Sequence, residues 1–301
     1  MKKKSASKKP PGLMSRISGV FKKSSISVWP LFGRDTLADA GQGSRIGKPR
    51  GPLETLFLKV GQSGVLLGRT AKLLFSAQCD KGESWRVAYR FANGSFWFVA
   101  IAMAFVGMIM VYQSTVQLDR AVGDTTLVGA SFFKLLVRVL GPTVIGMLLA
   151  CRVGAGIAAE IGAMSVTSQL DAMRMCAAEP IETLMVPRLR GGIVASMSLV
   201  VIGCASSLFA GMVTGIVWFS MSHTTYLNFS LVAPSDLIQG VVKAFSYGVA
   251  VPIVSGACGL SAHGGARGVG QATTDAVVGS SFVIVVMDSL ISMISHLLVG
   301  Q

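Results

Sequence analysis

Charged residues are scarce in this sequence of 301 residues. Asp, Glu, Lys and Arg together make up 14% of it, whereas ordinary soluble domains carry about 25%. Hydrophobic residues make up 51% of the chain, and its mean hydropathy is +0.62. This composition argues against a soluble globular protein.

Clustered metal ligands are also missing. The five cysteines form no C-x-x-C pair, and the 3 histidines lie in different segments of the chain. A zinc site needs several such side chains at short spacings. We therefore expect no metal site, and we interpret the cysteines as small side chains packed among other apolar residues.

Negative charge is absent from the start of the chain, where no acidic residue precedes Asp35. Up to Arg90 there are 18 basic and 5 acidic residues, and 9 of each follow, so the net charge of +13 arises before this point. Residues 1–50 are too polar to bury a core. They predict a basic tail that is either solvated or held at anionic lipid headgroups, and a plastid or mitochondrial transit peptide would have a similar composition.

Long apolar runs fill most of the remaining chain. Five segments approach the ~20 apolar residues that a bilayer requires, and they lie at about 93–117, 134–160, 191–219, 237–260 and 276–299. Before them, residues 53–76 place large apolar side chains at helical spacing with basic residues between them, as a helix lying in the membrane interface would. The sequence predicts an all-α integral membrane protein, so its pI of about 9.9 does not indicate nucleic-acid binding.

The charges of the loops predict an orientation. The 161–190 loop contains three arginines, whereas the 220–236 loop contains neither Lys nor Arg. Basic loops stay in the cytoplasm. We therefore expect the N-terminus, the 161–190 loop and the short loop around Arg267 to be cytoplasmic and Gln301 to lie outside.

One motif superficially resembles a dinucleotide site. Gly154-x-Gly156-x-x-Ala159 fits the G-x-G-x-x-A pattern, and Glu179 follows at the spacing of a ribose ligand. The residues before it continue an apolar helix, however, and no βαβ unit surrounds it. We interpret these small residues as a surface on which another helix packs closely, and we expect no nucleotide site in this chain.

The segment 160–190 is too apolar for a plain loop. Its apolar residues recur at helical spacing, and Pro180 and Pro187 interrupt its later part. This pattern predicts a short amphipathic helix between two spans. Such a helix either packs against its own bundle or is presented to a partner.

Residues 141–188 resemble the signature region of the MlaE (YrbE) family, the permease subunits of ABC transporters that work with MCE proteins. The matching features are the pair Gly141-Pro142, Arg152-x-Gly154, the stretch Ala159 to Met164, Gln169 to Ala172, and Pro187-Arg188. Glu179-Pro180 stands where the family has Asp-Pro. A second block, Gly268 to Asp288, resembles the family's last loop and helix, and the similarity runs from about Leu53 to Gln301.

The resemblance implies one subunit of an ATP-driven transporter of phospholipid or a related hydrophobic molecule. It implies a homodimer of this chain, two cytoplasmic ATPase subunits that bind ATP and Mg²⁺, and a hexameric MCE protein on the outer side. It further implies a bacterial inner membrane or, as the alternative, a plastid inner envelope. The chain itself is then not an enzyme and needs no cofactor of its own.

The resemblance also implies two sites. The first is a coupling helix at roughly Glu160 to Pro180, for which we predict an ATPase-contacting surface made of Glu160, Gln169, Asp171, Met173 and Glu179. The second is a lipid pocket near the outer leaflet. It lies between the two permease copies and is lined by their first and second spans. For this pocket we predict Met110, Val111, Tyr112 and Arg138, and we note that Val139 replaces a family glutamate beside Arg138.

Two charges lie inside predicted spans, Lys243 in the fourth and Asp288 in the fifth. A lone charge at the centre of a bilayer costs at least about 2.5–3.5 kcal/mol. We therefore expect the two to pair or to line a polar cavity. A buried pair that fixes helix packing and a direct role in transport are equally compatible with the sequence, and an ion- or proton-coupled transporter using both residues is the alternative function.

Overall fold

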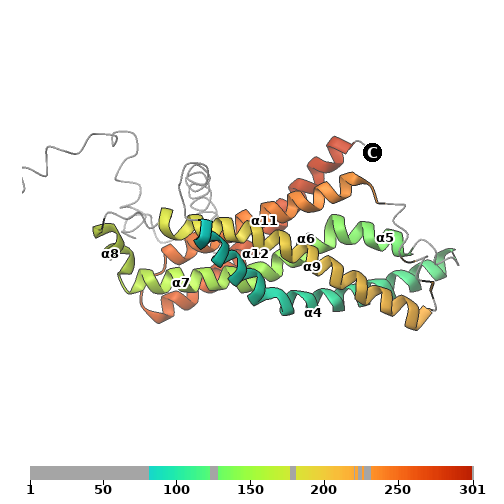
Figure 1. The fold of residues 1–301 in the computed structure, drawn as a ribbon, viewed down its shortest axis with the longest axis horizontal. Coiled ribbons are helices and arrows are strands. Elements are labelled where there is room, and N and C mark those ends of the chain that lie inside the picture. The colour runs from blue at the N-terminus through green and yellow to red at the C-terminus, as the bar shows by residue number, and fades with distance from the viewer. Residues whose placement is uncertain are drawn as a thin grey trace, which may run out of the picture. The chain divides into compact units, whose positions relative to one another are not determined.

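The structure is a computed structural model that describes residues 81–122, 128–176, 181–219, 221–222, 226 and 232–299. These residues form helices and no strand (Figure 1). Five of the helices are long and apolar enough to cross a membrane, which confirms the predicted fold class. The predicted basic tail, residues 1–50, and the predicted interfacial helix, residues 53–76, lie outside the described residues.

The five candidate spans follow one another along the chain. The first is α4 (Lys81–Val122), and the second is built from α5 (Val128–Leu135), η1 (Leu136–Leu140), α6 (Gly141–Leu149), η2 (Ala150–Gly154) and α7 (Ala155–Val166). The short helix α8 (Gln169–Met175) comes next. The third span is η3 (Ile181–Met185) with α9 (Val186–Phe219), the fourth is α11 (Pro234–Leu260), and the fifth is α12 (Ala266–Val299).

The helices extend beyond the apolar segments that the sequence predicts. The 42 residues of α4 correspond to about 63 Å at 1.5 Å per residue, roughly twice the thickness of a hydrocarbon core. Hydropathy detects only the part of a helix at membrane depth. The first turns of α4 contain the exposed residues Glu83, Arg86 and Arg90, so they are helical without being apolar.

The second span is helical throughout, although Pro142 lies inside the predicted segment. The segments η1 and η2 are π-helical, and Pro142 stands at the start of α6, directly after η1. Proline is tolerated in the first turn of a helix because its missing N–H needs no partner there. The chain therefore continues in the same direction past Pro142.

Glycines allow α4 and α9 to lie side by side (Figure 1). Gly107 of α4 faces the backbone and side chain of Ser207, and Gly211 of α9 faces Val111. A Cβ atom at either glycine would overlap these neighbours. Close backbone approach through small residues is how membrane helices gain packing contacts where the hydrophobic effect is absent.

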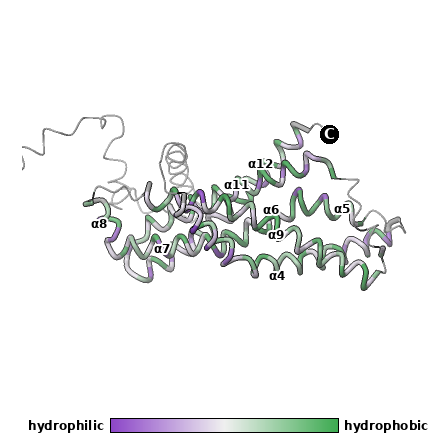
Figure 2. Tube along the Cα trace, viewed as in Figure 1, coloured by the Kyte–Doolittle hydropathy of each residue, from purple (hydrophilic) through white to green (hydrophobic). Residues whose placement is uncertain are grey.

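The fourth span, α11, lies at the centre of the bundle. The most apolar 18-residue stretch of α11 is 61% buried, whereas that of α12 is 11% buried. The helix α11 packs against α7, α9 and α12. The outward faces of α4, α9 and α12 instead expose large apolar side chains such as Phe105, Phe209 and Phe282. Hydrophobic residues continue along most of the described helices (Figure 2), as a lipid environment requires.

Candidate functional site

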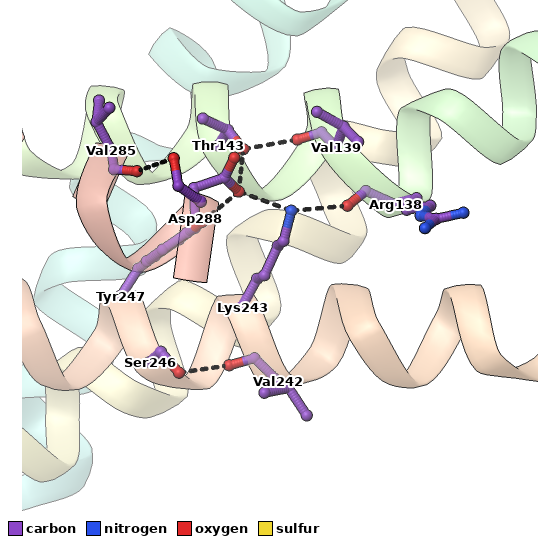
Figure 3. Close-up of polar contacts among 10 residues, drawn as sticks. Arg138, Val139, Thr143, Val242, Lys243, Ser246, Tyr247, Val285 and Asp288 are labelled. Carbon is purple, nitrogen blue, oxygen red and sulfur yellow. Dashed lines mark hydrogen bonds and ion pairs between the residues drawn. The ribbon is translucent and has the colours of Figure 1, made fainter. Parts of the chain in front are cut away.

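The structure brings Lys243 and Asp288 together in the interior of the helix bundle. Lys243 is fully buried, and its Nζ lies 2.7 Å from Oδ1 of Asp288. The same carboxylate oxygen accepts hydrogen bonds from the hydroxyls of Tyr247, at 2.7 Å, and Thr143, at 2.9 Å (Figure 3). The charge of Lys243 is thus balanced, and three helices meet at one carboxylate.

Lys243 makes a further contact, with the backbone of the second span. Its Nζ donates a hydrogen bond to the carbonyl of Arg138 at 3.1 Å. Pro142, four residues after Arg138, has no N–H that could compete for this carbonyl.

The side chain of Arg138 points away from this cluster (Figure 3). Its Nη1 lies 3.8 Å from Oδ1 of Asp236, and the Arg138 side chain is 37% exposed. Asp236 also accepts a hydrogen bond from the backbone N–H of Ala233 at 3.2 Å, which caps the N-terminus of α11 where a negative charge is favourable. The partly exposed guanidinium keeps donors available for an anionic group.

The three residues predicted for the lipid pocket on α4 do not share one face. Tyr112 is 45% exposed and lies edge-on to Trp218 at the end of α9, with ring centroids 6.1 Å apart. Met110 is half-buried, and Val111 is fully buried in the core. Successive residues of a helix point about 100° apart, so three adjacent residues cannot all face the same surface. Tyr112 and part of Met110 lie on the exposed surface of α4, and Val111 does not.

The predicted coupling segment consists of the end of α7, a tight turn and α8. Ser168 has a positive φ of 58° at this turn, and α8 begins at the next residue. Leu170 is buried and α8 packs against α7, whereas Gln169 and Asp171 are exposed and Met173 is half-buried. The predicted site residue Glu179 lies outside the described residues.

Glu160 lies away from α8, on α7. Its Oε2 is 3.0 Å from Nη2 of Arg188, which lies near the start of α9. Sequence reasoning used Arg188 as a loop charge and as part of the Pro187-Arg188 match, but it did not connect Arg188 to Glu160, because no local pattern links two residues that are 28 positions apart. It also missed Tyr247 and Thr143, although Tyr247 follows Lys243 by one helical turn and thus shares its face.

The glycine motif that resembles a dinucleotide site is helical. Residues Ala150 to Val166 form η2 and α7 without a strand, as the apolar context predicts. Gly154 faces Ser255 and Val251 of α11, and Ala158 is fully buried, whereas Gly156 faces open space. The small residues therefore admit α11 on one face of the helix only.

Comparison with known proteins places these features in a family. The profile of the family described as Permease MlaE matches residues 84–294, which reach from the first candidate span into the fifth and include α8. The chain belongs to the MlaE permease family. It is accordingly a permease subunit of an ABC transporter, a multi-pass membrane protein that is not itself catalytic and that works with an ABC ATPase in a lipid transport system.

Individual relatives agree with this assignment. A probable ABC transporter permease protein of Rickettsia prowazekii is 37% identical over 196 residues, which are 64% of this chain and 75% of the relative. The intermembrane phospholipid transport system permease protein MlaE of Haemophilus influenzae is 29% identical over 238 residues, 76% of this chain and 91% of the relative. The chloroplastic protein TRIGALACTOSYLDIACYLGLYCEROL 1 of Arabidopsis thaliana is 30% identical over 197 residues, 64% of this chain and 55% of the relative.

Proposed function

We propose that two copies of this MlaE permease move phospholipid, or a related hydrophobic molecule, between the membrane and a channel formed by a hexameric MCE protein on its outer side. The similarity to the Haemophilus influenzae protein, whose name specifies intermembrane phospholipid transport, carries the choice of substrate. ATP and Mg²⁺ bind the partner ATPase dimer. The membrane is the bacterial inner membrane, and the plastid inner envelope is the alternative suggested by the chloroplastic relative.

The helix α8 is the part of the chain that we assign to the ATPase. It lies between two spans and presents Gln169 and Asp171 at its exposed surface. The only other loop that the charge rule places in the cytoplasm contains Gly264 and Gly265, both with positive φ. The helix α8 packs against α7, and a helix transmits a displacement better than a glycine turn does.

The lipid-binding surface lies on the outer half of α4 and of the second span, where Tyr112 and Arg138 are partly exposed. Apolar side chains there would hold acyl chains, and the Arg138 guanidinium would bind a phosphate. Nη1 of Arg138 lies 3.8 Å from Asp236, which is beyond hydrogen-bonding distance, so an anionic headgroup would compete with Asp236 for the guanidinium.

Photo-crosslinking in the assembled transporter tests this surface. A photoreactive side chain at Tyr112 or Met110 should capture lipid, and the captured amount should change during ATP turnover because the substrate leaves the pocket. Mass spectrometry would identify the captured molecule. The matched control is Phe98, an exposed residue on the opposite half of the same helix. Turnover-dependent capture at Phe98 but not at Tyr112 would place the pocket at the other leaflet.

The proposed orientation predicts a labelling pattern. In a variant without native cysteines, Gln301→Cys should react in intact cells with a thiol reagent that cannot cross the membrane. Arg267→Cys, in the first turn of α12 just after the glycine-containing loop, should react only after permeabilisation because basic loops remain cytoplasmic. The reverse pattern would contradict the five-span orientation and, with it, the assignment of α8 to a cytoplasmic ATPase.

A further inference from the structure

The loop that contains α8 is closed at its base by an ion pair. Glu160 lies on α7, before the loop, and Arg188 lies at the start of α9, after it. Nη2 of Arg188 is 3.0 Å from the Glu160 carboxylate, and Nη1 donates a hydrogen bond to the carbonyl of Leu184 at 2.8 Å. The side chain of Arg188 is 9% exposed, so its charge depends on these two partners.

The two stems of the loop also pack against α11 and the turn that follows it. On the α7 side, Ile161 contacts Gly259, and the Ser165 hydroxyl donates a hydrogen bond to the carbonyl of Ala262 at 3.1 Å. On the other side, Met185 of η3 lies against Gly256. The base of the loop is therefore a three-helix junction in which only the Glu160–Arg188 pair joins α7 to α9 by a charge-assisted bond among the described residues.

We propose that Glu160 and Arg188 form a clamp that makes α7 and α9 move as one unit when α8 is displaced. A charge-assisted hydrogen bond is directional and about twice as strong as a neutral one, whereas apolar contacts between helices allow sliding. Through α11 the displacement would reach Lys243, which lies on the same helix. The clamp rests on the proposed role of α8, and it makes Glu160 a positioning residue rather than a contact of the ATPase.

A double-mutant cycle tests the clamp in the complete transporter reconstituted in vesicles. Glu160→Gln and Arg188→Gln should each lower the amount of lipid moved per ATP hydrolysed by about tenfold, since each removes the same charge-assisted bond. The double variant should be no worse than either single variant. Arg188→Lys keeps the charge and should recover part of the ratio, while Arg267→Gln, in the first turn of α12, should leave it unchanged.

Two outcomes separate failure of the clamp from failure of the proposed function. If the single variants keep the normal ratio of lipid to ATP, or if their effects multiply in the double variant, Glu160 and Arg188 do not act as a pair and the clamp is wrong. The clamp variants should also keep the ATPase bound during purification. If Asp171→Lys on α8 binds the ATPase normally as well, the role of α8 itself is wrong.

Discussion

Replacing Lys243 alone with methionine is expected to destabilise the protein by about 3–5 kcal/mol, because it leaves a carboxylate without its counter-charge in a low-dielectric interior. Asp288 would keep its hydrogen bonds from Tyr247 and Thr143 but lose the ammonium group 2.7 Å away. Thermal unfolding of the detergent-purified protein measures the effect as a lower Tm. Ser246→Ala is the matched control, since within the described part of the chain its hydroxyl donates a hydrogen bond only inside α11, to the carbonyl of Val242.

Replacing both charges should restore most of the loss. With Lys243→Met and Asp288→Leu together no unpaired charge remains, and such exchanges are often neutral or stabilising in buried ion pairs. A Tm as low as that of the single variant would contradict this account of the pair. The double variant also separates the two candidate functions, because lipid transport by a protein without either charge would exclude an ion relay through them.

Reversing the charges of the proposed coupling surface has the second large expected effect. Asp171→Lys combined with Glu179→Lys should weaken ATPase binding by at least about a hundredfold, because juxtaposed like charges at an interface cost several kcal/mol. Copurification of the ATPase from membranes measures it directly. Dimerisation of the permease and its contact with the MCE protein should remain intact.

The matched control for this surface is Glu83→Lys. Glu83 is exposed in the first turn of α4, so the substitution reverses a charge that the same orientation places in the cytoplasm but not on α8. If Glu83→Lys and the α8 variant weaken ATPase binding equally, the loss comes from the change in net charge and not from a contact at α8. If the α8 variant binds the ATPase and couples normally, α8 is only a connector between two spans.

The sequence predicted the spans well because hydropathy reports directly on the cost of placing a residue in lipid. It predicted the helix ends poorly, as in α4, because a helix continues into polar surroundings without changing its backbone. The predicted pocket shows a different limit. Met110, Val111 and Tyr112 are adjacent in sequence, but helix geometry turns Val111 into the core while Tyr112 remains exposed.

Contacts between distant segments were the least predictable part of the candidate site. The cost of a buried charge suggested that Lys243 and Asp288 would meet, and the structure places them 2.7 Å apart. No comparable argument pointed to Glu160 and Arg188, since both lie near predicted membrane boundaries where a charge is inexpensive. The acceptor role of the Arg138 carbonyl left only a partial signal in the sequence, which is that Pro142, four residues later, has no N–H to donate to it.

The two π-helical segments alter the helical phase of the second span. A π turn contains one more residue than the α turn it replaces, so each segment shifts the direction of all later side chains by about 100°. If side-chain directions are extrapolated from α5 to α7 as though the whole span were α-helical, the directions expected for α7 are therefore wrong by about 200°. Arg138 and Glu160 can thus be aimed independently, one toward α11 and the other toward α9, although a single continuous helical stretch carries both.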